Sequence, residues 1–273
     1  MNISHRYFDL EEFFSSASAS GYTCCELWTG AMHLYVDCHG YDSLEQVREL
    51  SHRYGVRVVG LCPEQNNPKP WNVAVRGEAG QKRILSYFKN VIDVAVELGA
   101  PQILVTSGWA YLDEPAEDAW ARSVAMLRSV CDYADTRGIR VALEALQPSE
   151  SVLVNTAQDV ARILEAVDRP NLKACIDFGA MEVAGDTIDG YFEVLGDKIV
   201  HTHFVDVGGG TTHLAWGDGE RDMRADLEAL MRHGYTGYAS AETCDGRYYQ
   251  DPSKATTQVI DMYRRVIAEM EAE

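Results

Sequence analysis

The chain has 273 residues, of which 46% are apolar, and its formal net charge is −18. Its length is close to the ~250 residues typical of one barrel of eight β/α units, so one large core can be buried. A charge this negative repels polyphosphate backbones and anionic lipids, which disfavours nucleic acids and membranes as partners. We expect residues 1–273 to form a single domain.

The cysteines indicate a reducing compartment. There are seven, which is an odd number, and no two of them form a CxxC pair. Several stand inside apolar runs, where a reduced thiol packs as a small hydrophobic group. The N-terminus lacks the charged-then-apolar pattern of a signal peptide, and no apolar run reaches the ~18 residues of a membrane helix. These features predict a cytoplasmic protein.

Glycines divide the chain into repeating units, in which a segment with helical spacing ends and a strand-like apolar run follows. These glycines are Gly21, Gly55, Gly99, Gly138, Gly196 and Gly234. The left-handed backbone that ends many helices is least strained in glycine, so each of them marks a helix C-terminus. In the unit that lacks such a glycine, we expect Asn171 to take this role.

The strand-like runs are almost continuously apolar, as in parallel strands that are covered on both faces. The first is residues 1–4, and the others end near Trp28, Leu61, Thr106, Glu144, Asp177, Phe204 and Glu242. Eight β/α units with short crossovers predict a closed (β/α)8 TIM barrel. An open doubly wound sheet would favour a glycine-rich first turn such as GxGxxG, which follows no strand here. The longest loops without periodicity, 62–78 and 205–221, are candidate lids over a substrate.

Four of these runs carry an ionisable residue at their end, namely Glu144, Asp177, His203 and Glu242. Their separations of 33, 26 and 39 residues each correspond to one β/α unit. Neighbouring strands lie ~4.8 Å apart, so the four side chains can converge at the C-terminal end of the barrel. Three crowded carboxylates repel one another unless a cation compensates them. We therefore expect one divalent metal ion, with Mn²⁺ favoured and Mg²⁺, Co²⁺, Ni²⁺ or Zn²⁺ compatible. Taken singly, each residue could instead bond to a neighbouring loop.

Further residues near strand ends are candidate substrate contacts. They are Trp28, Glu64, Asn66, Trp109 and His213. Each has a simpler alternative, because a tryptophan there is often packing and a loop histidine is often solvated. Glu26 is expected to line the mouth of the barrel. His201 faces the same side as His203 by strand alternation and is expected inside the barrel or behind a metal ligand. Asp206 is expected either to orient a ligand or to be a plain loop residue.

Several motifs resemble the xylose isomerase-like TIM-barrel sugar isomerases and epimerases. The matches are LeuGluAlaLeu at 143–146, IleAspPhe at 176–178, HisThrHisPheValAsp at 201–206, GlyAspGlyGlu at 217–220 and AlaGluThr at 241–243. Together they extend the likeness over nearly the whole chain. The resemblance implies that Glu144, Asp177, His203 and Glu242 bind one divalent metal and that the two glutamates also transfer a proton.

The same resemblance implies a small sugar substrate, a ketose or a ketose conjugate. One glutamate would remove the proton on carbon 3 to give a cis-enediolate, and the other would return a proton on the opposite face. Glu150 matches a substrate-contacting glutamate of the ketose 3-epimerases. Those enzymes have a histidine where this chain has Ala180 and an arginine where it has Gly209. These departures predict a bulkier or differently held substrate than a free ketohexose.

Three other functions stay open on the sequence alone. A lyase on the same scaffold would expel a group from an enolate, as in a deglycosidase acting on 3-oxo-glycosides or an inosose dehydratase-like enzyme. Barrel-type phosphodiester cleavage would need further His and Asp ligands and a basic groove, and neither is visible. A non-catalytic binding protein is the third. A homo-oligomer or an accessory subunit is compatible with all of them.

Overall fold

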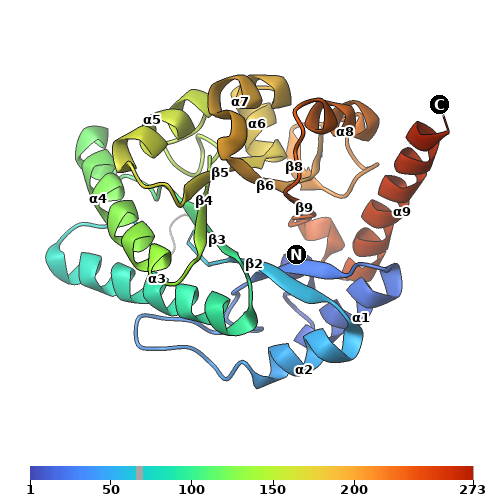
Figure 1. Ribbon diagram of the computed structural model, residues 1–273, viewed down its shortest axis with the longest axis horizontal. Coiled ribbons are helices and arrows are strands. Elements are labelled where there is room, and N and C mark those ends of the chain that lie inside the picture. Colours follow the sequence, from blue (N-terminus) through green and yellow to red (C-terminus); the bar gives the residue numbers. More distant parts are fainter. Residues whose placement is uncertain (66–69, 273) are drawn as a thin grey trace.

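A computed structural model describes residues 1–65 and 70–272 of the chain. In this part of the chain, seven parallel strands form one sheet that curves into a nearly closed barrel (Figure 1). In order around the sheet they are β1 (Cys24–Trp28), β2 (Arg57–Cys62), β3 (Gln102–Thr106), β4 (Arg140–Glu144), β5 (Leu172–Asp177), β6 (Ile199–His203) and β9 (Tyr238–Ser240). Each strand pairs in parallel with the next. The predicted TIM barrel is confirmed.

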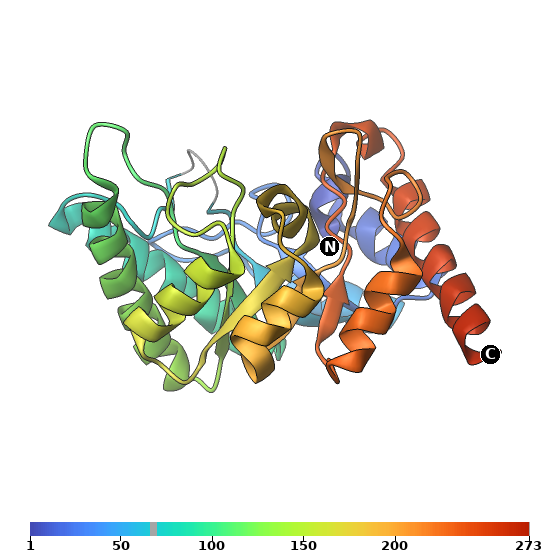
Figure 2. The same ribbon diagram turned by 90° about the horizontal axis from the view of Figure 1, so that it is seen from above.

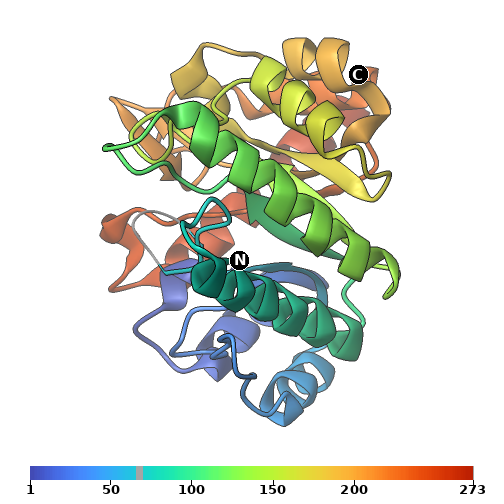
Figure 3. The same cartoon turned by 90° about the vertical axis from the view of Figure 1, so that its left-hand side faces the viewer.

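The helices surround the strands and bury the outer face of the sheet (Figure 1). They are α1 (Leu10–Ser20), α2 (Glu45–Tyr54), α3 (Glu78–Leu98), α4 (Ala116–Asp135), α5 (Ala157–Val167), α6 (Phe178–Ala184), α7 (Ile188–Leu195), α8 (Met223–Arg232) and α9 (Pro252–Glu271). Figure 3 shows α3 and α4 lying side by side. Their apolar stripes face the strands, as the sequence periodicity requires. Within the described residues, no helix is both long and apolar enough to cross a bilayer.

The helix ends follow the glycine pattern in part. Gly138 and Gly234 have positive φ but lie three and two residues after the ends of α4 and α8, and Gly196 after α7 has φ of 54° with ψ of −127°, which is outside the left-handed helical region. Gly21, Gly55 and Gly99 adopt left-handed backbone directly after α1, α2 and α3, as predicted. After α5, however, Asp168 takes the left-handed position with φ of 51°, so the assignment of Asn171 was wrong. The reason is that α5 already ends at residue 167. The Asn171 side chain instead donates to the carbonyl of Cys131 in α4, at 2.9 Å.

Residues 1–4, which were predicted to be the first strand, lie at the start of the chain in and beside a short 3-10 helix, η1 (Asn2–His5). The prediction was wrong because the side chain of Asn2, rather than the backbone of a further strand, bonds to the backbone of β1. The Asn2 amide donates to the carbonyl of Trp28 at 3.0 Å and accepts from its N–H at 2.6 Å. The amino group of Met1 donates to the carbonyl of Ala241, past the end of β9, at 3.1 Å. The N-terminal segment therefore bridges β1 and β9, where an eighth strand would close the barrel.

The two faces of the sheet are packed differently. Most of the core lies between the outer face and the helices. The inner face holds a separate small cluster, namely Trp28, Cys62, Leu104, Ala142 and Cys175. Because strand side chains alternate, Ala142 points inward with Glu144, and Cys175 points inward with Asp177. The apolar cluster thus lies beneath the charged residues at the strand ends.

Long connections follow the strands at one end of the barrel (Figure 2). The predicted lid at 205–221 contains an antiparallel hairpin of β7 (Asp206–Gly208) and β8 (Thr211–Leu214). The other predicted lid, 62–78, includes residues 66–69, which lie outside the described residues. Two further 3-10 turns are η2 (Gly196–Lys198) and η3 (Gly246–Tyr248).

The buried carboxylate of Asp206 organises the loop after β8. It accepts the backbone N–H groups of Val207, Gly217, Gly219 and Arg221 at 2.8, 2.9, 2.9 and 3.0 Å. A carboxylate that accepts several amide N–H groups is a strong acceptor and fixes the backbone around it. Asp206 therefore holds the GlyAspGlyGlu loop against the hairpin, and these four bonds are all to loop backbone rather than to the strand-end residues.

Candidate metal centre

Three parallel strands end in candidate ligands, and a fourth ligand follows shortly after β9. Glu144, Asp177 and His203 are the last residues of β4, β5 and β6, and Glu242 stands two residues after β9. The strand register places Asp177 beside His203 and His203 beside Ser240, whereas Glu144 stands beside Cys175, two residues before Asp177. The C-terminal ends of neighbouring parallel strands lie close together at one end of the barrel, where the Glu144 side chain still reaches His203.

The four side chains meet there. One ligand atom from each of Glu144, Asp177, His203 and Glu242 lies within 4.8 Å of the others. Nδ1 of His203 is 2.6 Å from Oε1 of Glu144, 2.7 Å from Oε2 of Glu242 and 3.6 Å from Oδ2 of Asp177. Glu144 and Asp177 are buried, and His203 is fully so. The sequence predicted this convergence, and the structure brings all four residues together.

Negative charge dominates the cluster. Burial disfavours a charged imidazole, but the carboxylates of Glu242 and Glu144 outweigh this and hold the pKa of His203 well above its usual value. Burial raises the pKa of Glu144 to about 8. Three carboxylates beside one imidazole nitrogen form an oxygen-rich set that suits a divalent cation such as Mn²⁺ or Mg²⁺. The residues present therefore fit the expected ion.

His213 joins the cluster from the hairpin. Its Nε2 lies 3.1 Å from Oδ2 of Asp177 and 3.6 Å from Oε2 of Glu242. The backbone at His213 is left-handed, with φ of 58°, which is uncommon outside glycine. Burial would lower its pKa, but the Asp177 carboxylate raises the pKa of His213 to about 10. Oδ1 of Asp177 accepts the backbone N–H of Ala180 at the start of α6, so both oxygens are oriented.

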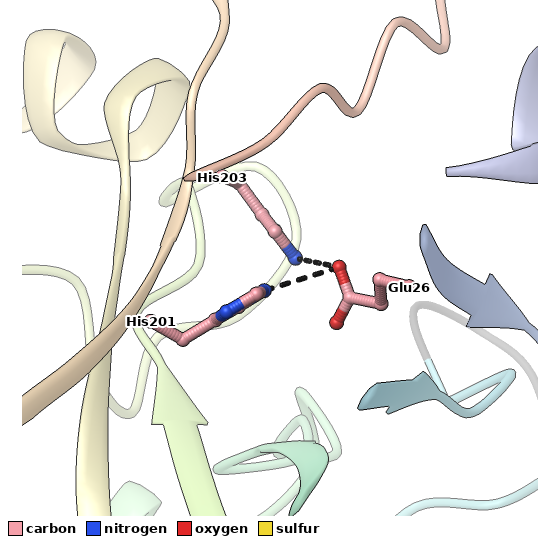
Figure 4. Close-up of side chains that lie close together, drawn as sticks. All are labelled: Glu26, His201 and His203. Carbon is pink, nitrogen blue, oxygen red and sulfur yellow. Dashed lines mark hydrogen bonds and ion pairs between the residues drawn. The ribbon is translucent and has the colours of Figure 1, made fainter. Parts of the chain in front are cut away.

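Glu26 lies beneath the cluster, in the barrel interior (Figure 4). The sequence placed it at the mouth, and this is corrected, because its side chain is fully buried and turned toward β6. Oε2 of Glu26 lies 3.2 Å from Nε2 of His201 and 3.2 Å from Nε2 of His203. These two histidines, which lie two residues apart on β6, place their rings on the same side of the strand, as expected for His201. The period-2 pattern HisThrHis was the signal for this pair, but nothing in the sequence linked it to Glu26.

A pocket of about 330 Å³ opens over the cluster and is lined by Glu144, Asp177 and Glu242. Glu150 and His213, both predicted substrate contacts, line it as well. Its volume lies at the lower end of the ~300–1,000 Å³ range of small-molecule sites. Burial raises the pKa of Glu150, whose carboxylate accepts the backbone N–H of Gln147 at 3.2 Å.

The other predicted contacts lie elsewhere. Trp28 and Glu64 line an adjoining pocket of about 400 Å³. The ring of Trp109 packs edge-on against Tyr111, with centroids 4.9 Å apart, and lines neither pocket. Asn66 lies outside the described residues. Arg6 lines both pockets, although no motif in the sequence marked it as a site residue.

Comparisons with known proteins agree with this architecture. Residues 14–266 match the family described as xylose isomerase-like TIM barrel. Fructoselysine 3-epimerase of Shigella flexneri is 31% identical over 268 residues, which cover 98% of this chain and 96% of that protein. Its full-length similarity confirms the expected class of enzyme, a sugar epimerase or isomerase.

Solved structures give the same result at the level of the fold. The IOLI protein, described with a bound zinc atom, superposes with a TM-score of 0.79 at 21% identity and covers 98% of this chain and 96% of its own. The 3-keto-D-glucoside 4-epimerase YcjR of E. coli has a TM-score of 0.77 at 19% identity, with 93% and 94% covered. The fold, the strand-end residues and the match over residues 14–266 lead to one assignment. This chain belongs to the xylose isomerase-like TIM barrel family.

Proposed function

We propose that this protein is a divalent-metal-dependent 3-epimerase of a ketose or ketose conjugate. The observation that carries the proposal is the placement of two glutamates beside one metal-ligating imidazole. Glu144 and Glu242 approach Nδ1 of His203 to 2.6 and 2.7 Å from different strands. Epimerisation requires one group to remove a proton and another to supply one on the opposite face, and this site offers two carboxylates for these tasks.

Glu144, Asp177, His203 and Glu242 would hold the metal, which as a Lewis acid would polarise a bound ketose and stabilise negative charge on its oxygens. The side chains carry out the proton transfers. One of Glu144 and Glu242 takes the proton from carbon 3, which gives a cis-enediolate. The other then delivers a proton to the opposite face of the same carbon. The configuration of the substrate decides which glutamate is the base.

The pocket also supports a substrate with a substituent. Fructoselysine, the sugar named in the 31% identical relative, is a ketose joined to an amino acid. Ala180 lines the pocket at the position where ketose 3-epimerases carry a histidine. A methyl side chain leaves room that an imidazole would fill. A conjugate resembling fructoselysine is therefore the substrate class that we favour.

Solvent-isotope exchange tests this function directly. The metal-loaded enzyme is incubated in D₂O with fructosamines, free ketoses and 3-oxo-glycosides, and the products are followed by NMR and mass spectrometry. We expect deuterium at carbon 3 of an otherwise intact epimer. Release of water or an aglycone would assign the enzyme as a lyase instead. Binding without exchange in any class would contradict catalysis.

A further inference from the structure

The catalytic pocket continues into a second, apolar pocket through Arg6. Arg6 lines both, whereas Glu242 lines only the first and Trp71 only the second. The guanidinium carbon of Arg6 lies 4.7 Å from the ring centre of Tyr249, in the first pocket, and 5.3 Å from that of Trp28, in the second. Arg6 therefore stands at the boundary between them.

The guanidinium of Arg6 is held by contacts that leave its charge uncompensated. Its Nε donates to the carbonyl of Ile3 at 2.9 Å, and the Tyr249 and Trp28 rings bracket the group. Stacking on aromatic rings fixes a guanidinium without consuming its outer N–H donors. Among the residues described, the contacts of Arg6 are with a carbonyl oxygen and two aromatic rings and not with a carboxylate, although acidic residues outnumber basic ones by 42 to 24.

Arg6 is also the only Arg or Lys among the described residues that line either pocket. The carboxylates of Glu144, Glu150, Asp177 and Glu242 make the first pocket a poor site for any anion that approaches them. An anionic group is favoured beside Arg6, because the described lining of the second pocket holds one carboxylate, that of Glu64, against four in the first. This separation matches a substrate whose neutral sugar occupies the first pocket and whose charge lies beyond it.

The second pocket has the lining that an aliphatic arm needs. Its walls include Trp28, Trp71 and Val36. Met32 and Tyr35 at its rim are exposed to 56% and 44%, and Tyr7 to 72%. Large apolar side chains gathered at the edge of a pocket are typical of a ligand-binding surface.

We propose that Arg6 binds a carboxylate on the substituent of the ketose, with the aliphatic part of that substituent in the second pocket. The predicted substrate class is a 1-amino-1-deoxyketose conjugated to an amino acid with a free carboxylate. This inference rests on the proposed epimerase function and refines its substrate. One guanidinium matches a carboxylate through two parallel N–H···O bonds.

The test compares Arg6→Gln with the wild type on matched substrates. They are a ketose–amino acid conjugate, its methyl ester, the unsubstituted ketose and a ketose 6-phosphate. We expect Arg6→Gln to raise KM for the conjugate roughly 10–100-fold, as for a lost charge-assisted pair, with kcat nearly unchanged. KM for the ester and the ketose should stay as in the wild type. Arg247→Gln is the control, because Arg247 pairs with Asp245 and lines neither pocket.

Each other outcome contradicts part of this proposal. A wild-type enzyme that treats conjugate and ester alike would overturn the subsite. If Arg6→Gln changed KM for the ketose 6-phosphate alone, Arg6 would bind a phosphate rather than a carboxylate, and the substrate assignment would be overturned. Absence of carbon-3 exchange with every substrate would instead overturn the epimerase function, so the two failures are distinguishable.

A second inference comes independently from Glu26 (Figure 4). The two ring nitrogens of His203 face different partners, with Nδ1 toward the metal cluster and Nε2 at 3.2 Å from Oε2 of Glu26. A histidine that binds a metal through one nitrogen commonly donates the other N–H to a carboxylate, which fixes the ring and its tautomer. His201 bonds the same Oε2 atom and holds Glu26 in place.

We infer that Glu26 is a positioning residue, which keeps the proton of His203 on Nε2 and the Nδ1 lone pair directed at the metal. Glu26→Gln should weaken Co²⁺ binding about 10–100-fold in a competition titration. In the Co²⁺-loaded protein, the shifted, exchangeable N–H proton of His203 seen by NMR should move and exchange faster. Glu114→Gln removes another largely buried carboxylate, paired with Arg76 and Arg122, and should change neither property.

Unchanged Co²⁺ affinity together with an unchanged N–H resonance in Glu26→Gln would overturn this role. If that variant does not fold, Glu26→Asp is compared with the wild type in the same two measurements, because metal bound at Nδ1 places the proton of His203 on Nε2 whether or not Glu26 accepts it. A ¹H–¹⁵N correlation spectrum of the Zn²⁺-loaded wild type should show the His203 proton on Nε2. A proton on Nδ1 would contradict the inference.

Discussion

Nδ1 of His203 lies 2.6 Å from Oε1 of Glu144, although 59 residues separate them along the chain. They are the final residues of β6 and β4, and Asp177 ends β5 between them. The ends of three neighbouring parallel strands therefore bring three candidate ligands together, and Glu242 completes the set. The site depends on the barrel rather than on any single loop.

Replacing Glu144 by Gln should abolish proton transfer while weak metal binding remains. The amide has nearly the volume of the carboxylate but cannot act as a base at carbon 3. We expect exchange of the carbon-3 proton to fall about 10³-fold, within the range for lost general-base catalysis. NMR measures exchange in D₂O, and inductively coupled plasma mass spectrometry measures bound metal. Glu242→Gln is the companion variant, and normal turnover in Glu144→Gln would refute its assigned role.

Metal removal should destabilise the folded protein. The crowded carboxylates of Glu144, Asp177 and Glu242 repel one another once the cation is gone, and ligand binding stabilises by mass action. At a metal concentration of about 1,000 times Kd, the free energy of unfolding rises by about 4 kcal/mol, which raises Tm by roughly 10 °C for a chain of this size. Differential scanning fluorimetry after EDTA dialysis and Mn²⁺ addition measures it. Equal melting curves for the metal-free and metal-loaded protein would contradict the metal site.

Asp206→Ala should release the loop after β8. Four backbone N–H groups would lose their acceptor, including those of Gly217 and Gly219. We expect the free energy of unfolding to fall by about 3 kcal/mol, the magnitude of a broken buried network. Urea denaturation measures the change. Exposed Asp197→Ala should leave stability within about 0.5 kcal/mol of the wild type, and the same result for Asp206→Ala would show that the loop does not depend on its carboxylate.

Gly179→Ala should reduce activity more than stability. A Cβ atom there would lie 3.0 Å from Oδ1 of Asp177 and 3.1 Å from Cε1 of His213, so one of them must shift. Alanine is about 1 kcal/mol more favourable than glycine within a helix, and this gain in stability in α6 offsets part of the cost of the crowding. We expect kcat/KM to fall roughly tenfold, because small displacements of catalytic groups are costly, with Tm nearly unchanged.

The matched control for this change is Gly190→Ala in α7, where the nearest atom is a side-chain hydroxyl 3.2 Å away. Alanine there should leave kcat/KM as in the wild type, since the Thr187 side chain can move aside. Steady-state kinetics and melting curves of both variants distinguish a local clash at the site from a general effect of glycine replacement. Wild-type kinetics in Gly179→Ala would show that the site tolerates the added methyl group.

The alternation of helices and strands and the four candidate ligands near strand ends could be predicted from the sequence. Both follow from local chemistry, because apolar periodicity specifies which face is buried and glycines such as Gly55 end helices. That pattern alone predicts which residues stand at the C-terminal ends of the barrel strands. For this reason Glu144 and Asp177 could be named as candidate ligands without any contact being known.

The contacts between groups far apart in the chain could be found only in the folded structure. Asn2 substitutes for a strand beside Trp28, Glu26 on β1 bonds two histidines on β6, and Arg6 separates two pockets. No repeating pattern in the sequence marks these contacts, because each depends on how the two ends of the sheet come together. The role of a buried carboxylate or of an arginine in a pocket follows from the groups that it contacts. When those groups lie far apart in the chain, the curvature of the barrel determines which of them come together.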